Sequence, residues 1–213
     1  MISRLQYISQ GKTSEEHLEN IQRACASGIE WVQLRIKKTN PKTFLETAKK
    51  AREITNHYQT RLIINDNYKI VKEINADGVY LEESKDSPLK IRKHLGKFYS
   101  IGAIANTLED CKSLIDKNVD YITLGPFTQN EKGSKQSLEV VVYQVLIETL
   151  QTAIPIIAFG GVTLNNINEL INTGIYGAAV SEEITRDFST IPVYHQILKA
   201  PSTNEQRYSF DNK

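Results

Sequence analysis

The chain has 213 residues, of which 40% are hydrophobic and 24% are charged. It is long enough to bury one sizeable core and too short for two ordinary α/β domains. Because 26 Lys and Arg balance 25 Asp and Glu, the net charge of +1 argues against nucleic acid or an anionic membrane as a partner, and we expect small-molecule partners.

The cysteines and the apolar runs indicate a cytoplasmic protein. Cys25 and Cys111 have neither the CxxC spacing nor the neighbouring histidine pair of a zinc site, and they do not form a disulfide framework. No run approaches the roughly 20 apolar residues that span a bilayer, and the N-terminal residues lack the pattern of a secretory leader. We therefore expect free thiols in a reducing compartment. The sequence is compatible with a homo-oligomer but does not determine the oligomeric state.

Eight short runs rich in β-branched and aromatic residues recur along the chain, and each is followed by a longer segment with helical spacing of apolar residues. In chain order, the predicted strands are 5–9, 31–36, 62–66, 78–81, 99–105, 121–125, 154–159 and 177–181. Repeated units of roughly 25 residues predict a single (β/α)8 barrel, a TIM barrel of the α/β class, over residues 1–200. The polar tail 201–213 has no apolar periodicity, and we expect it to be frayed.

The predicted helices have recognisable starts. Residues 13–16 and 107–110 have the pattern of capping boxes, and Pro41 and Pro88 suit a first helical turn. The alternative architecture is an open doubly wound sheet, which usually carries a glycine-rich loop after its first strand. Residues 9–12 are too poor in glycine to form that loop, so the barrel is favoured.

Polar side chains close the second and third predicted strands, where a barrel of this class builds its active site. Gln33, Arg35 and Lys37 end the second strand, and Asn65 and Asp66 end the third. Taken alone, the two cations fit a solvated or ion-paired strand edge, and the Asn-Asp pair fits a helix cap. Taken together, they describe an anion site beside a carboxylate that can supply an oxygen ligand to Mg2+.

The last two strands end in small residues. Gly160 and Gly161 follow the seventh strand, and Ser181 follows the eighth. A lone glycine pair is most often a tight turn. Next to a helix start, however, backbone N–H groups freed by these glycines suit a phosphate. All four histidines fall in predicted helices, where core or surface roles are expected: His17, His57, His94 and His195.

These motifs resemble those of the thiamine phosphate synthase family, in the same order and over nearly the whole chain. The matching segments are QLRIK at 33–37, IND at 64–66, GVYL at 78–81, DYITLGP at 120–126 and IPIIAFGG at 154–161. The resemblance implies that 4-amino-5-hydroxymethyl-2-methylpyrimidine diphosphate is joined to a thiazole phosphate with loss of pyrophosphate. It also implies Mg2+ as cofactor and catalysis mainly by positioning and charge stabilisation.

The resemblance also implies roles for individual residues, by position. The catalytic residues are Arg35, Lys37 and Lys132. The pyrimidine diphosphate contacts Gln33, Arg35, Lys37 and Asn65, and the thiazole phosphate contacts Gly160, Gly161, Val180 and Ser181. Further substrate contacts fall on Asn106 and Thr128, and the metal ligands on Asp66 and Asp86.

The chain departs from the family pattern at four strand ends. Lys85 stands where the family has its second metal-binding aspartate, so that Asp86 or a glutamate would have to replace it. Ile104 replaces a small hydroxyl residue, and the loop 128–136 has altered spacing. Residues 182–183 are both glutamate, and a carboxylate there would repel a phosphate. A related branch that aromatises the thiazole depends on a histidine where this chain has Asn106.

Three functions therefore stay open. The first is a working thiamine phosphate synthase. The second is a catalytically weak or inactive relative that binds a thiamine precursor or a protein partner. The third is an unrelated phosphate-binding barrel enzyme, such as an isomerase or aldolase, which would need a Schiff-base lysine or an acid/base pair at a strand end.

Overall fold

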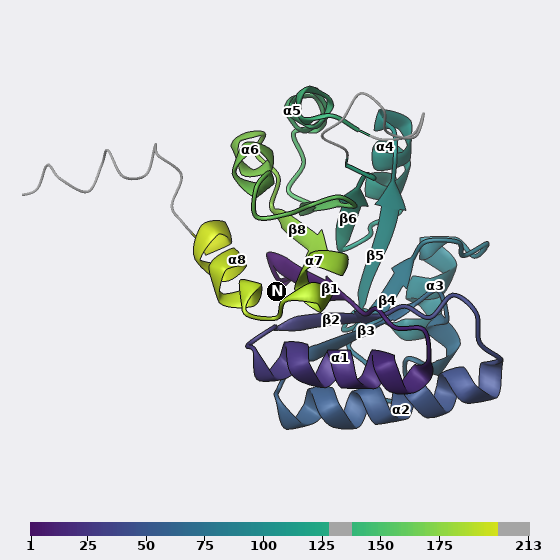
Figure 1. Cartoon of the computed structure of the whole chain (residues 1–213). Coiled ribbons are helices and arrows are strands. Elements are labelled where there is room, and N and C mark those ends of the chain that lie inside the picture. The colour runs from purple at the N-terminus through teal and green to yellow at the C-terminus, as the bar shows by residue number, and fades with distance from the viewer. Residues whose placement is uncertain (128–137, 200–213) are drawn as a thin grey trace, which may run out of the picture.

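A computed structural model describes residues 1–127 and 138–199. Its eight parallel strands pair in chain order and close into a barrel, with β1 hydrogen-bonded to β8. This confirms the predicted (β/α)8 architecture (Figure 1). Every predicted strand is present within two residues at each end: β1 (Leu5–Ile8), β2 (Trp31–Leu34), β3 (Arg61–Asn65), β4 (Gly78–Leu81), β5 (Ser100–Ala105), β6 (Tyr121–Leu124), β7 (Ile156–Phe159) and β8 (Gly177–Val180). The predicted tail 201–213 lies outside the described residues.

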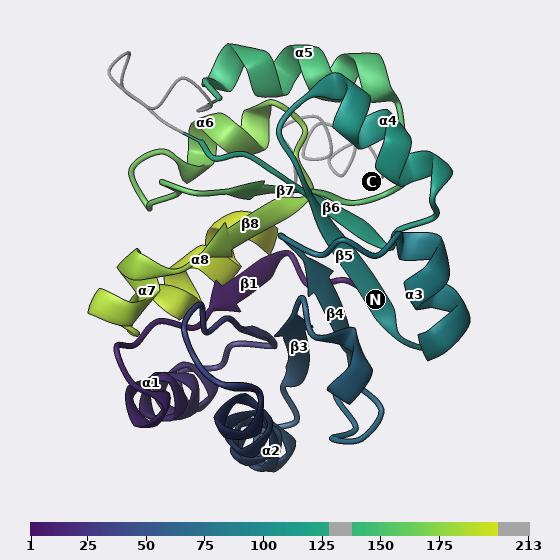
Figure 2. The ribbon, with the colours of Figure 1, turned by 90° about the vertical axis from the view of Figure 1, so that its right-hand side faces the viewer.

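Helices lie outside the ring of strands (Figures 1 and 2). They are α1 (Ser14–Ala26), α2 (Pro41–His57), α3 (Pro88–Leu95), α4 (Leu108–Asp116), α5 (Val140–Leu150), α6 (Ile167–Asn172), α7 (Glu182–Arg186) and α8 (Thr190–Lys199). One connection differs from the predicted alternation: the fully described segment between β3 and β4 holds only the 3₁₀ turn η1 (Tyr68–Ile70). Asp66 and Asn75 adopt positive φ values of 55° and 52°, so the chain turns twice there and leaves no length for an α-helix.

The predicted helix starts are confirmed. Thr107 and Asp110 form a reciprocal capping box at α4, and the Thr13 side chain accepts a hydrogen bond from the Glu16 N–H at α1. Pro41 and Pro88 occupy the first turns of α2 and α3, where a missing N–H costs nothing. Among the described residues, no helix has the length and apolar composition needed to cross a membrane.

Side chains of alternating strand residues build two cores. The larger core lies between the strands and the helices. The inner core fills the barrel and contains Ile8, Trp31, Ile63, Tyr80, Tyr121, Ile157 and Ala179. Tyr121 is the central inner residue, because its ring meets Trp31 edge-on at 5.6 Å and stacks with Tyr80 at 6.3 Å. A Cβ added at Gly102 would collide with this ring, so β5 needs glycine there.

We expect Gly102→Ala to lower the free energy of unfolding by about 1–3 kcal/mol, because overpacking forces neighbouring side chains off their rotamers. Urea-induced unfolding would measure the change. The double variant Gly102→Ala/Tyr121→Leu is the control, since the smaller side chain leaves room for the new methyl group. If Gly102→Ala were as costly in the Tyr121→Leu background as in the unaltered protein, the proposed steric cause would be wrong.

Candidate active site

Two adjacent cavities open at the carboxyl ends of the strands. The first has a volume of about 660 Å³ and is lined by the segments after β2, β3 and β4. The second, of about 310 Å³, is lined mainly by the segments after β1, β7 and β8. Arg35 lines both cavities and therefore stands at the boundary between them. Nine of the predicted site residues line these cavities: Arg35, Lys37, Asn65, Asp66 and Asp86 the first, and Gly160, Gly161, Val180 and Ser181 the second.

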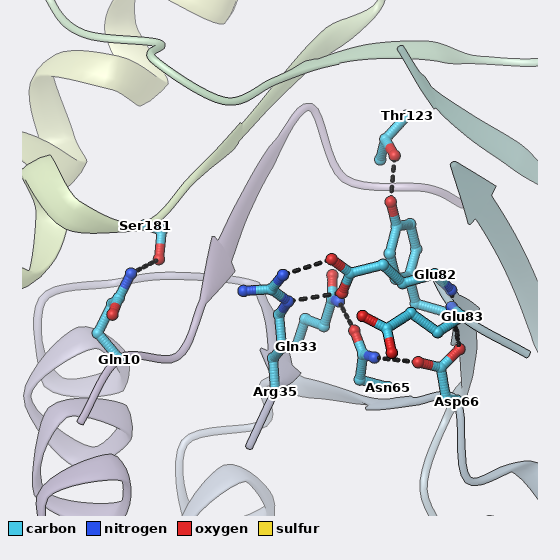
Figure 3. Close-up of polar contacts among 10 residues, drawn as sticks. Gln10, Gln33, Arg35, Asn65, Asp66, Glu82, Glu83, Thr123 and Ser181 are labelled. Carbon is cyan, nitrogen blue, oxygen red and sulfur yellow. Dashed lines mark hydrogen bonds and ion pairs between the residues drawn. The ribbon is translucent and has the colours of Figure 1, made fainter. Parts of the chain in front are cut away.

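A chain of hydrogen bonds joins the ends of β2, β3 and β4 (Figure 3). The Gln33 amide donates to Asn65 Oδ1 at 2.6 Å, and the Asn65 amide donates to Asp66 Oδ2 at 2.7 Å. The backbone N–H groups of Glu82 and Glu83 donate to Asp66 Oδ1 at 2.8 and 3.0 Å. Gln33 Oε1 is buried and has no hydrogen-bond partner among the described residues, which is uncommon for a buried polar atom.

Arg35 forms a bidentate ion pair, as one reading of the strand edge expected, but its partner Glu82 was not predicted. Arg35 Nε donates to Glu82 Oε2 at 2.6 Å, and Arg35 Nη2 donates to Glu82 Oε1. The two side chains are only 22% and 13% exposed. Burial alone would raise the pKa of Glu82, but the hydrogen bonds and charge of Arg35 outweigh it and leave the pKa below its ordinary value. Both groups are therefore charged at neutral pH.

Asp66 and Asp86, the predicted metal ligands, both line the first cavity. Asp86 is already held by Lys90 Nζ at 2.6 Å and by the Tyr68 hydroxyl at 2.9 Å, and these hydrogen bonds lower its pKa. Within the described ranges, no cluster of three or more His, Cys, Asp or Glu side chains is suited to a metal ion. Oδ2 of Asp66 accepts one hydrogen bond and keeps a second lone pair. Asp66 can thus serve a cation that also binds substrate phosphates, whereas Asp86 would first have to release Lys90.

The second cavity contains the predicted glycines. Gly160 and Gly161 have φ values of 79° and 60°, a conformation that favours glycine. Asn166, which was not predicted, braces this loop: its amide donates to the Gly161 carbonyl at 2.9 Å, and its Oδ1 accepts from the Thr163 N–H at 2.8 Å. Val180 borders the cavity, but its side chain packs in the outer core.

Ser181 is held in place by the end of β1 and the residues that follow it. Its hydroxyl donates to the Ile8 carbonyl at 2.9 Å. It also accepts from the Gln10 amide at 2.8 Å (Figure 3). Gln10 also lines the second cavity and was not singled out from the sequence. The residue carried no signal, because a lone glutamine after a strand is common on surfaces.

The two glutamates after Ser181 do not act as one repulsive pair. Glu182 is 80% exposed and pairs with Arg186 at 2.8 Å. Glu183 turns toward the neighbouring elements, where it accepts from the Leu164 N–H at 3.0 Å and from the Tyr194 hydroxyl. The expected repulsion is therefore offset, because one carboxylate is solvated and paired and the other is satisfied by donors of the fold.

Of the remaining predicted residues, two are described and two are not. Asn106 follows β5 and donates through its amide to the Gly125 carbonyl, which joins the ends of β5 and β6. Lys37 is exposed at the first cavity. Thr128 and Lys132 lie outside the described residues. The histidines lie in helices as expected, and only His17 reaches a strand end, where its Nδ1 is 2.9 Å from the Ser9 hydroxyl.

The comparisons decide the family. A family model described as thiamine monophosphate synthase matches residues 5–184. The chain belongs to the thiamine monophosphate synthase family. It is 39% identical over 204 residues to the thiamine-phosphate synthase of Flavobacterium psychrophilum, a match that covers 93% of this chain and 99% of that protein. The thiamine-phosphate synthase of Flavobacterium johnsoniae is 38% identical over 190 residues, covering 87% of this chain and 90% of that protein.

Solved structures confirm the fold of this family member. Thiamine phosphate pyrophosphorylase from Pyrococcus furiosus has a TM-score of 0.77 at 23% identity, covering 92% of this chain and 96% of that chain. A 3-hexulose-6-phosphate synthase has a TM-score of 0.63 at 15% identity, covering 92% and 98%. Proteins with so little sequence identity can share a fold and catalyse different reactions, so these two similarities support the barrel fold alone.

The two glutamates of α7 allow a test of whether Glu183 holds the loop that lines the second cavity. We expect Glu183→Gln to lower the free energy of unfolding by about 1–2 kcal/mol and to weaken phosphate binding, because charge-assisted bonds to Leu164 and Tyr194 hold the loop. Glu182→Gln, which makes the same charge change at an exposed position, should shift stability by less than about 0.5 kcal/mol. Urea unfolding and calorimetric titration of inorganic phosphate would measure both. Equal effects of the two variants would contradict the assignment.

Proposed function

We propose that this protein is a thiamine-phosphate synthase that joins 4-amino-5-hydroxymethyl-2-methylpyrimidine diphosphate to a thiazole phosphate and releases pyrophosphate. The observation that carries the proposal is the pair of adjacent cavities at one mouth, which share Arg35. A reaction between two phosphorylated substrates needs two anion sites close enough together for the reacting atoms of the substrates to meet. The relatives named thiamine-phosphate synthase support the same assignment over nearly the whole chain.

The larger cavity is proposed to hold the pyrimidine diphosphate. Asn65 presents its amide to the ring, held by the buried Gln33 behind it, and Lys37 supplies positive charge to the diphosphate, with Lys38 and Lys69 lining the same cavity. Asn106, Thr128 and Lys132 are proposed to complete this site. The smaller cavity is proposed to hold the thiazole phosphate on the Gly160–Gly161 backbone and Ser181, with Val180 contributing backbone atoms.

The proposed reaction breaks the bond between the pyrimidine methylene carbon and the diphosphate oxygen. The electron pair leaves with pyrophosphate, and the lone pair of the thiazole nitrogen then forms the new bond to the methylene carbon. The lysines of the mouth stabilise the charge on the leaving group, and the two cavities, with Arg35 at their boundary, align the reacting atoms. Bound Mg2+ would neutralise further diphosphate charge, with Asp66 and, after release of Lys90, Asp86 as its protein ligands.

The second candidate is an inactive relative that binds a thiamine precursor or a protein partner. The Arg35–Glu82 ion pair favours this candidate, because Glu82 partly neutralises a cation that a substrate phosphate would otherwise use. No lysine is among the buried polar and charged residues of the described chain, which weighs against the buried Schiff-base lysine of an aldolase. We also propose that the protein works in the cytoplasm, which the free and buried thiols of Cys25 and Cys111 support. Its association as a homo-oligomer stays a prediction.

Direct assay separates the two candidates. Incubation with both substrates and Mg2+ should yield thiamine phosphate and an equal amount of pyrophosphate, each measured chromatographically. Thermal-shift titration with each substrate alone distinguishes an inactive binder, which is stabilised without turnover, from a protein with no site. Absence of both product and stabilisation would refute the proposed function.

The metal ligands should differ in importance. We expect Asp66→Asn to abolish the Mg2+-dependent activity, because Asp66 has a lone pair available and the amide keeps an acceptor for the Glu82 N–H. Asp86→Asn should reduce activity by less than about tenfold, because that carboxylate is committed to Lys90 and Tyr68. The assay above, run over a range of Mg2+ concentrations, measures both. Comparable losses would show that Asp86 is a full ligand.

A further inference from the structure

The Arg35 guanidinium has one edge occupied and one edge open. Of its five N–H donors, Nε and one on Nη2 are directed at Glu82. The third nitrogen, Nη1, has no hydrogen-bond partner in the part of the chain that the structure describes. In Figure 3 it lies on the side away from Glu82, toward Ser181. Glu82 lines the first cavity and not the second, so the occupied edge faces the first cavity. The opposite, open edge is the one on the side of the second cavity, which Arg35 also lines.

The backbone of Glu82 is fixed by a hydrogen bond. Its N–H donates to Asp66 Oδ1 at 2.8 Å, so the side chain begins at a point fixed by the end of β3. The backbone N–H of Arg35 donates to the Ser9 hydroxyl at 3.1 Å, which fixes the other partner. With both side chains mostly buried and the contact bidentate, the direction of the guanidinium plane is set by the ion pair.

We propose that Glu82 is a positioning residue that assigns Arg35 to the monophosphate in the second cavity by occupying the guanidinium edge facing the first. This inference rests on the proposed function and adds a specificity determinant to it. The diphosphate in the first cavity then depends on Lys37, Lys38 and Lys69, and it meets the carboxylate of Glu82 as a neighbouring negative charge. Loss of Glu82 should therefore move the two anion affinities in opposite directions.

The test is Glu82→Ala, with two separate calorimetric titrations. Thiazole phosphate titrated into the free protein reports the second cavity. Pyrophosphate titrated at saturating thiazole phosphate reports the first. We expect the variant to bind thiazole phosphate roughly fivefold more weakly, because Arg35 loses its orientation, and pyrophosphate roughly fivefold more tightly, because a like charge is gone and the guanidinium is free to turn. Glu82→Gln should shift both in the same directions by less, and thermal unfolding checks that each variant is folded.

Two controls isolate the ion pair. Glu83→Ala removes the same charge from the next residue, which is exposed and lines the same cavity, and it should leave thiazole phosphate affinity unchanged. In an Arg35→Ala background, adding Glu82→Ala should cause no further loss of thiazole phosphate affinity, because the pair acts through Arg35. If Glu82→Ala strengthened both ligands, or left thiazole phosphate affinity unchanged, the positioning role would be overturned. If the unaltered protein bound neither ligand, the proposed function itself would fail.

Discussion

Ring closure is the constraint on which the mouth of this protein depends. Because all eight strands are parallel and β1 pairs with β8, residues far apart in the sequence must open on the same face. The Ser181 hydroxyl reaches the Ile8 carbonyl and the Gln10 amide only through this closure. The same closure brings the cavity formed after β7 and β8 next to the one formed after β2, β3 and β4. Arg35 stands at that boundary, where its ion pair with Glu82 occupies one edge of the guanidinium.

The opposite face of the barrel uses its charges differently. Asp77 precedes β4, accepts from the Leu62 N–H at 2.8 Å, and pairs with Arg52. Asp120 precedes β6 and repeats the arrangement, with the Ile101 N–H and Arg92 as its donors at 2.6 Å. In both places a carboxylate ties the start of one strand to its neighbour and to a helix. The charges at the amino ends of the strands therefore hold the fold, while those at the carboxyl ends include groups that line the two cavities, such as Lys37 and Asp66.

Strand positions were predictable because period-two patterns and capping residues are local signals. The predicted cluster of Gln33, Arg35, Asn65 and Asp66 followed from the rule that parallel strands end on one face. Glu82 and Glu183 could not be assigned in the same way. Successive residues of a helix point about 100° apart, so Glu183 turns to Tyr194 while its neighbour Glu182 stays in solvent. The partner of a loop carboxylate is set by three-dimensional distances, which local sequence patterns do not encode.

The polar groups on the floor of the mouth bear on the type of chemistry proposed. Tyr80 and Thr123 share a buried hydrogen bond, and burial raises the pKa of Tyr80, so this hydroxyl stays neutral. No histidine of the described chain lines either cavity, and the carboxylates there are held by hydrogen bonds or exposed. Such a floor is poorly suited to abstracting a proton.

The proposed bond formation needs no protein base, because the thiazole nitrogen attacks through a lone pair and carries no proton to remove. The demand that remains is charge stabilisation on the departing pyrophosphate, and the lysines that line the first cavity, Lys37 among them, are the groups that can meet it.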